Sequence, residues 1–464
     1  MKPSTKPSDG GKRDGGRSST STVGRMAPHA VTTRDPGRPV AATRFVTVLI
    51  LAIPLAPYLD QNVLGGVPYV TTIRIVCVAG LIHLSLGVRG VERDRWTSQA
   101  AAPAVVLSIY LATSAFLING GIAGPAKAVD TVLLPSLVFI LLVRAAAAGS
   151  LISPVTAAVG TAVLGIEAII GAIEFRSGAY FLTLSGRDDV LAYGFAGSQA
   201  VGARATGTFV HPEEYAVFGA ALSLFLVAYF MRRGWAVAAY GVATLGVVIG
   251  TASGLRGILL PFAILTVWVI AGQGRHRIFR RATLCAVASL AAYLMFRAAG
   301  SLAEGAISDR FTESDNIYTR IASFESAARI FWDHPLVGVG YGGYFATAID
   351  PKYSSTVAGV ASVPFPHNSV LGMAAETGLV GLSLFAWLWV SLLRTVWQSP
   401  VGTGRNVGNA ILILFIVSGL SLNLAIESLP VLAALSLSAA SLLWIAEGST
   451  VSRDLRTPTT GARV

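Results

Sequence analysis

The chain has 464 residues, of which 53% are hydrophobic and only 13% are charged, with a formal net charge of +11. A soluble globular domain carries about 25% charged residues, so this composition excludes an ordinary soluble protein. The positive charge lies in the leading tail and in short loops between apolar runs, without a basic patch interleaved with aromatic residues. We therefore expect no nucleic-acid partner.

The first segment, residues 1–43, is rich in glycine, serine, threonine, proline, lysine and arginine and has no apolar periodicity. Such a composition predicts a disordered basic tail. An apolar stretch near the start, which a secretory signal peptide needs, is missing. The two cysteines, Cys77 and Cys285, both fall within apolar runs, so the sequence predicts no disulfide framework, zinc site or redox pair.

Apolar runs that approach or exceed the length of a bilayer-spanning helix follow one another from residue 44 to residue 446. They predict an all-α, polytopic membrane protein with about twelve transmembrane helices. The predicted spans are 44–58, 67–88, 102–119, 128–146, 151–174, 213–231, 235–251, 255–272, 278–299, 368–395, 407–426 and 429–446. They form groups over 44–174, 213–299 and 368–446, and residues 447–464 make a second tail.

Positive charge alternates between successive loops of this prediction. Arginines cluster in every second loop and in the C-terminal tail, whereas residues 59–66 have no lysine or arginine and 120–127 have only Lys127. The positive-inside rule then places both termini in the cytoplasm. The two long connections, 175–212 and 300–367, fall on the outer side of the membrane.

The longer outer loop contains a helical pattern from Tyr318 to Asp333, which Pro335 ends. Glu325 and Arg329 are four residues apart and can form an ion pair. The apolar residues along one side are Ile321, Phe324, Ala328 and Phe331. This pattern predicts a short amphipathic helix that lies on the outer face of the membrane.

Several arginines gather at the outer ends of predicted helices, among them Arg204, Arg256 and Arg320. A single arginine there can simply extend to the lipid headgroups. Several on one side are suited to a diphosphate, because guanidinium groups stay charged and bind two oxygens at once. His367 opens the span that follows the long loop, where it is either a general base or a polar anchor at the interface.

Glu376 lies nine residues after His367, which in a straight helix is about 13 Å of rise and half a turn out of phase. The two side chains therefore cannot touch, and we expect Glu376 to have a structural role, bonding a neighbouring helix. Glu167, in the middle of another span, is interpreted in the same way.

The sequence predicts no metal site and no cofactor. His211, Glu213 and Glu214 match no standard metal-ligand spacing, and the pair Asp188 and Asp189 is expected to be a solvated loop. The glycines from Gly338 to Gly343, Gly340 included, do not form a phosphate-binding loop of the Walker type. They are expected to form a turn packed beside the site.

Four pieces of the sequence together resemble the O-antigen ligase and polymerase family over about residues 204–395. The first is the outer loop from Arg320 to Gly343, with His334-Pro335-Leu336-Val337-Gly338-Val339-Gly340. The second is Pro366-His367-Asn368-Ser369, followed by Ala375-Glu376-Thr377-Gly378-Leu379-Val380-Gly381. The other two are Gly207-Thr208-Phe209 and the turn Ser253 to Gly257.

The resemblance implies a metal-independent, membrane-embedded glycosyltransferase of the bacterial plasma (inner) membrane. Such enzymes transfer a glycan from an undecaprenyl diphosphate carrier to an acceptor hydroxyl on the outer face. Two arginines and one histidine are considered essential in the family, and position by position they become Arg256, Arg320 and His367. The family turn usually places serine next to arginine, whereas here Gly254 and Leu255 separate Ser253 from Arg256.

We also expect Arg204, Asn368 and Arg329 to bind the substrate, with Glu376, Gly338 and Gly340 structural. The acceptor is a lipid or protein for a ligase, or another lipid-linked glycan for a polymerase, and both alternatives stay open.

A flippase or transporter of lipid-linked oligosaccharide is the main alternative function. It needs charged residues along a path through the membrane, where the sequence supplies little besides Glu167 and Glu376. A structural scaffold is a further alternative, in which the outer arginines could be replaced.

Overall fold

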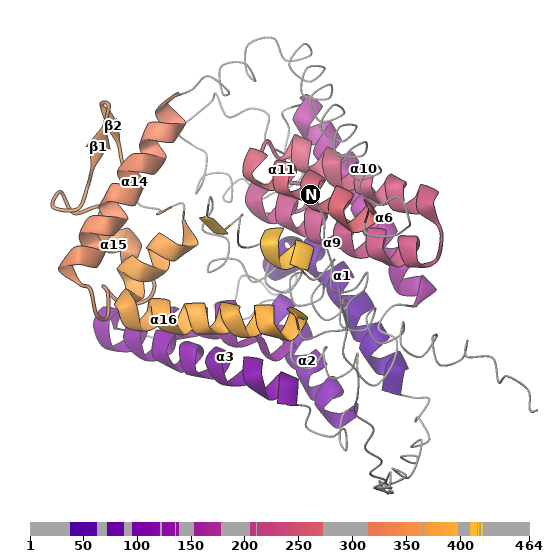
Figure 1. Ribbon diagram of the computed structural model, residues 1–464, viewed down its shortest axis with the longest axis horizontal. Helices are drawn as coiled ribbons and strands as arrows, with labels where there is room; N and C mark the ends of the chain where they lie inside the picture. The colour runs from indigo at the N-terminus through magenta and orange to yellow at the C-terminus, as the bar shows by residue number, and fades with distance from the viewer. Residues whose placement is uncertain are drawn as a thin grey trace, which may run out of the picture. The chain divides into compact units, whose positions relative to one another are not determined.

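The structure is a computed structural model, and its description covers residues 38–62, 72–87, 95–120, 123–134, 136–138, 153–177, 205–209, 211–271, 314–363, 366, 368–397, 409–414, 416 and 419–420. Most of these residues are helical, as predicted (Figure 1). The predicted spans 278–299 and 429–446, most of the loop 175–212 and the two tails lie outside the described residues, apart from the start of α1.

The helices are α1 (Arg38–Asn62), α2 (Thr72–Gly87), α3 (Arg95–Ser114), α4 (Ala123–Ala128), α6 (Pro154–Ser177), α9 (Pro212–Arg232), α10 (Ala236–Ala252), α11 (Arg256–Ala271), α14 (Ser314–Asp333), α15 (Tyr344–Ala348) and α16 (Ser369–Trp397), with π-helical turns η1 (Ala115–Asn119) and η2 (Val129–Leu133). Three of them, α6, α9 and α16, are long and apolar enough to cross a membrane. Shorter apolar helices lie within α1, α3 with η1, and α10. The total of about twelve spans stays a prediction.

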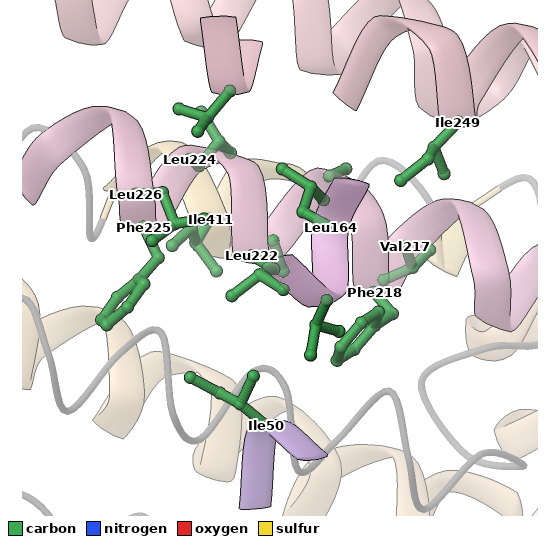
Figure 2. Packing of buried hydrophobic residues seen from close by; sticks show 14 of the residues in the cluster. Ile50, Leu164, Val217, Phe218, Leu222, Leu224, Phe225, Leu226, Ile249 and Ile411 are labelled. Atoms are coloured by element: carbon green, nitrogen blue, oxygen red, sulfur yellow. The ribbon is translucent and has the colours of Figure 1, made fainter. Parts of the chain in front are cut away.

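The helix α9 is the centre of the first hydrophobic core. Almost all of its residues are buried, and it packs against α6, α10 and α11. Figure 2 shows its side chains, among them Phe218 and Leu222, beside Leu164 of α6 and Ile50 of α1. Pro212 begins the helix with φ already suited to it. Glu213 and Glu214 follow in the first turn, where negative charge is favourable.

The helix α6 has one exposed apolar side and one buried side. Val155, Ile166, Ile169 and Ile173 are all more than half exposed, and their spacing places them on one stripe of the helix. An exposed stripe of large apolar side chains on so long a helix is typical of contact with lipid. The opposite side packs against α1, α9 and α10.

A second core joins α3 to α16, which lie side by side (Figure 1). Leu107 and Leu111 of α3 pack with Met373 and Phe385 of α16. Tyr341, from the loop before α15, is fully buried in the same cluster. The long loop is thereby anchored to two apolar helices.

A third, smaller core belongs to the long loop itself, where α14, α15 and the first part of α16 meet. A short hairpin also packs on α14, with β1 (Thr356–Val357) antiparallel to β2 (Val360–Ala361) and Val357 paired with Val360. Its two turn residues, Ala358 and Gly359, both have positive φ, as a two-residue hairpin turn requires. The core residues are Ala327, Ile330, Tyr344, Ala348, Tyr353 and Ala375.

The helix predicted in this loop is present, and it begins at Ser314 rather than at Tyr318. The side that packs on the rest of the loop is made of small residues such as Ala322, Ser326 and Ala327, which are buried. The predicted apolar stripe lies on the opposite side, where Ile321 is 40% exposed. Small residues let the loop backbone approach α14 closely, and contact of the bulky stripe with the outer face of the membrane stays a prediction.

Candidate active site

The loop 205–209 is held by two carboxylates of α6. Glu174 Oε2 accepts hydrogen bonds from the backbone N–H groups of Thr206 and Gly207, both at 2.8 Å. Glu167 Oε2 accepts from the N–H of Thr208 at 3.2 Å, and Glu167 Oε1 accepts from its hydroxyl at 2.6 Å. Both glutamates are almost fully buried. A buried carboxylate is tolerated when several donors face it, and these two meet four.

Of these two carboxylates, only Glu167 was expected from the sequence to need a bonding partner. The two are about two helical turns apart, which places them on the same side of α6. That spacing was a usable signal. Their partner loop, more than thirty residues away in the chain, could not be inferred from it.

The contact between the loop 205–209 and α6 requires glycine at position 207. Its φ is +59°, and a Cβ added there would lie 2.4 Å from Glu167 Oε2 and 2.6 Å from the ring of Tyr215. The hydroxyl of Tyr215 donates to the backbone oxygen of Glu167 at 2.8 Å. Phe209 is fully buried, and its ring centroid lies 5.1 Å from that of Phe218. Each residue of the motif Gly207-Thr208-Phe209 therefore has a packing or bonding role.

The same loop is bonded to the turn that carries Arg256. The N–H of Ala205 donates to the backbone oxygen of Ala252 at 2.9 Å. In that turn the hydroxyl of Ser253 donates to Gly250 O at 2.8 Å and accepts weakly from the N–H of Leu255 at 3.4 Å. Ser253 is fully buried, so its role is to shape the turn. Arg256 is the first residue of α11.

The helix α16 is broken at Gly378, where φ is 64° and ψ is −163°. Residues 335–339 of the long loop occupy the break. Val339 N–H donates to Ala375 O at 3.1 Å, Leu379 N–H donates to Pro335 O at 2.8 Å, and Val380 N–H donates to Leu336 O at 3.2 Å. The loop thus satisfies backbone groups that the interrupted helix leaves without intrahelical partners. We call this arrangement the interlock.

Two glycines allow the interlock, because each has a positive φ and lies against the other segment's backbone. A Cβ on Gly338 would lie 2.2 Å from the carbonyl carbon of Glu376, and a Cβ on Gly378 would lie 2.3 Å from that of Leu336. From α3, the hydroxyl of Tyr110 donates to Thr377 O at 2.8 Å. The two family-like motifs, Gly338-Val-Gly and Glu376-Thr-Gly, are therefore the two halves of one contact.

Glu376 bonds the loop beside this break. Its Oε1 accepts from the N–H of Tyr344, the first residue of α15, at 3.3 Å. The hydroxyl of Tyr344 in turn donates to Ser323 O of α14 at 3.3 Å. Burial raises the pKa of the Tyr344 phenol, so it stays a donor at neutral pH. These are contacts of the kind that a structural role for Glu376 requires.

Asn368 caps the N-terminus of α16. Its Oδ1 accepts from the N–H groups of Val370 at 2.9 Å and Leu371 at 3.0 Å, as an N-cap asparagine does. Its Nδ2 donates to Leu420 O at 2.9 Å. Both the oxygen and the nitrogen of the side chain predicted to bind substrate thus form hydrogen bonds within the protein.

Arg329 and Arg320 both lie on α14. The predicted ion pair of Arg329 with Glu325 is confirmed, at 3.7 Å. Arg329 Nη1 also donates to Ser354 O at 3.2 Å, and Ser355 Oγ donates to Glu325 Oε2 at 2.6 Å. Arg329 therefore ties α14 to the segment that leads into the hairpin. Arg320, two residues before the buried residue Ala322 of α14, is half-buried.

His367 and Arg204 lie outside the described residues, as does the side chain of Arg256. Arg256 begins α11, one of the helices around α9, whereas Arg320 lies on α14 and Asn368 caps α16. Within the described residues, no group of three or more histidine, cysteine, aspartate or glutamate side chains could hold a metal ion.

Comparison with known families adds the decisive observation. Residues 214–386 match the family model described as O-antigen ligase. This segment is similar to the O-antigen ligase family. It contains Arg256, Arg320 and His367 together with both halves of the interlock, and the loop 205–209 directly precedes it. The O-antigen ligase match, with the apolar helices, indicates a membrane glycosyltransferase of this type. No curated protein matches the chain.

Proposed function

We propose that the protein transfers or polymerises a glycan from an undecaprenyl diphosphate-linked donor onto an acceptor hydroxyl at the outer face of the plasma membrane. The observation that carries this proposal is the O-antigen ligase match over residues 214–386, which includes all three residues assigned to the chemistry.

In the proposed reaction His367 accepts the proton of the acceptor hydroxyl as that oxygen attacks the anomeric carbon of the donor. The bond between the anomeric carbon and the diphosphate oxygen breaks, and undecaprenyl diphosphate leaves. Arg256 and Arg320 stabilise the negative charge on the leaving group. Because guanidinium groups supply this charge, the reaction needs no metal ion.

The interlock supports this assignment through geometry. It bonds the loop after α14 to the first part of α16. Arg320 lies on α14, and α16 begins two residues after His367. Ala327 and Ile330 of α14 pack with Ala375 of α16 in the same region. A transferase needs its base and its charged groups held rigidly, since effective catalysis depends on near-ideal positions.

The proposal is tested by replacing His367 with alanine in a strain that lacks the native gene. Surface glycan and labelled lipid-linked intermediates are then compared, with the protein level measured in parallel. We expect loss of surface glycan and accumulation of the donor on the outer leaflet, because removing a general base costs about 10²- to 10⁴-fold in rate. Arg256→Ala and Arg320→Ala should have the same phenotype.

His211→Ala is the matched control, because His211 is exposed and its side chain makes no capping bond to α9. Normal glycan in the His367→Ala strain would remove His367 from the chemistry. Donor trapped on the inner leaflet in the null strain would instead favour the flippase. Single uncoupled repeat units would indicate a polymerase, and long unattached chains a ligase.

A further inference from the structure

The two buried carboxylates of α6 have no part in the proposed reaction, although their position in a membrane-crossing helix is costly. Glu167 is 2% exposed and Glu174 is 3% exposed. Each is turned away from the exposed stripe of α6 and toward the loop 205–208. Together they form a cradle, by which we mean Glu167, Glu174 and the three residues Thr206 to Thr208 that donate to them.

The cradle is connected to the turn before Arg256 by a short path. Glu174 fixes the N–H groups of Thr206 and Gly207, and the preceding residue, Ala205, donates to Ala252 O at the end of α10. The turn Ser253 to Leu255 follows, and Arg256 begins α11. In the sequence, Arg204 directly precedes Ala205. The cradle thus fixes the backbone that leads to Arg256.

We propose that Glu167 and Glu174 are positioning residues, which orient the backbone on either side of the Ala205–Ala252 contact so that Arg256 meets the diphosphate of the donor. This inference rests on the proposed transferase function. The carboxylates act as hydrogen-bond acceptors and take no proton from the substrate. Gly207 is part of the device, since a Cβ there would collide with Glu167 Oε2.

The test uses the full-length protein purified in detergent with lipid-linked glycan extracted from the null strain as donor. Glu174→Ala and Glu167→Ala remove the acceptors, so kcat should fall about 10²-fold, with the KM for the acceptor unchanged. Glu174→Gln keeps an oxygen that can accept both N–H bonds, and it should restore kcat to within about five-fold of the wild-type value. Glu213→Gln, in the first turn of α9, is the control for loss of a nearby charge.

Loss of kcat in the glutamine variant equal to that in the alanine variant would overturn the proposal, since it would assign the carboxylate to proton transfer. Should the alanine variants not accumulate, Thr208→Val is the deciding variant, because it removes the hydroxyl bond to Glu167 at almost constant volume. The melting temperature should fall, since a buried carboxylate loses one donor, and kcat measured below that temperature should fall several-fold. Unchanged kcat in Thr208→Val would overturn the role of Glu167. If the wild-type protein transfers no glycan, the proposed function has failed; if it does and all these variants match it, only the positioning role has failed.

Discussion

The cradle and the interlock fix two loops of the same family-like region in opposite ways. In the cradle, side-chain carboxylates of one helix bind the backbone of a distant loop. In the interlock, two backbones bond to each other directly, and side chains are excluded at Gly338 and Gly378. The first device depends on the chemistry of particular side chains, whereas the second depends on their absence. Substitutions should therefore damage the two regions by different rules.

The largest expected effect follows from adding one methyl group to the interlock. Gly378 has φ and ψ values that are essentially restricted to glycine, and its Cβ would collide with the backbone of Leu336. Gly378→Ala should lower the free energy of unfolding by at least ~3 kcal/mol. Gly338→Ala should do the same. Thermal unfolding in detergent and the yield of monodisperse protein measure the loss.

Gly342→Ala separates the collision from the strain of a positive φ. Gly342 has φ +82°, and no atom of the described residues lies within 4 Å of the Cβ position. The cost there should be only about 1 kcal/mol. Equal melting temperatures for Gly342→Ala and Gly378→Ala would show that the interlock does not constrain the protein.

The next effect comes from the hydroxyl that bonds to the broken helix. Tyr110→Phe leaves Thr377 O without its donor from α3, and an unsatisfied buried carbonyl costs about 1–3 kcal/mol. The melting temperature should fall, whereas Tyr240→Phe, on the exposed side of α10, should leave it unchanged. If the two variants melt alike, the hydroxyl of Tyr110 does not support the break.

A smaller effect is expected at the cap of α16. Asn368→Ala removes the acceptor for the N–H groups of Val370 and Leu371 and should cost about 1 kcal/mol. Asn368→Ser keeps a capping oxygen and should recover most of that stability. Donor titrations then separate capping from substrate binding. A serine variant of wild-type stability with a clearly raised KM for the donor would show that Asn368 also binds the substrate.

The two regions also differ in how far the sequence predicted them. Apolar periodicity located α9, α10, α11 and the helix in the long loop, because burial and lipid contact both leave a regular pattern. The motif glycines were expected to form a turn beside the site. Their partner, the break at Gly378, was not expected, because a continuous apolar run does not reveal a backbone interruption whose bonds are supplied by another segment.

The contacts of the cradle could not be predicted from the sequence, for a related reason. Glu167 was recognised as a buried carboxylate in need of a partner, but a partner far away in the chain follows from tertiary contact alone. Asn368 and Arg329 were expected to bind the substrate. In the structure both side chains bond to protein, since polar side chains at helix ends and hairpins also serve backbone groups, and their contact with substrate stays a prediction.

The smallest effect is expected at Arg329, and it decides between a tether and a substrate contact. The pair with Glu325 is about half exposed on both sides, and such pairs contribute about 0–1 kcal/mol. If Arg329 only ties α14 to the segment before the hairpin, Arg329→Gln and Glu325→Gln should lower stability equally and leave the KM for the donor unchanged. If Arg329 binds the diphosphate, Arg329→Gln should raise that KM at low ionic strength while Glu325→Gln does not. We expect the first result, because Ser354 O and Glu325 already occupy the guanidinium group.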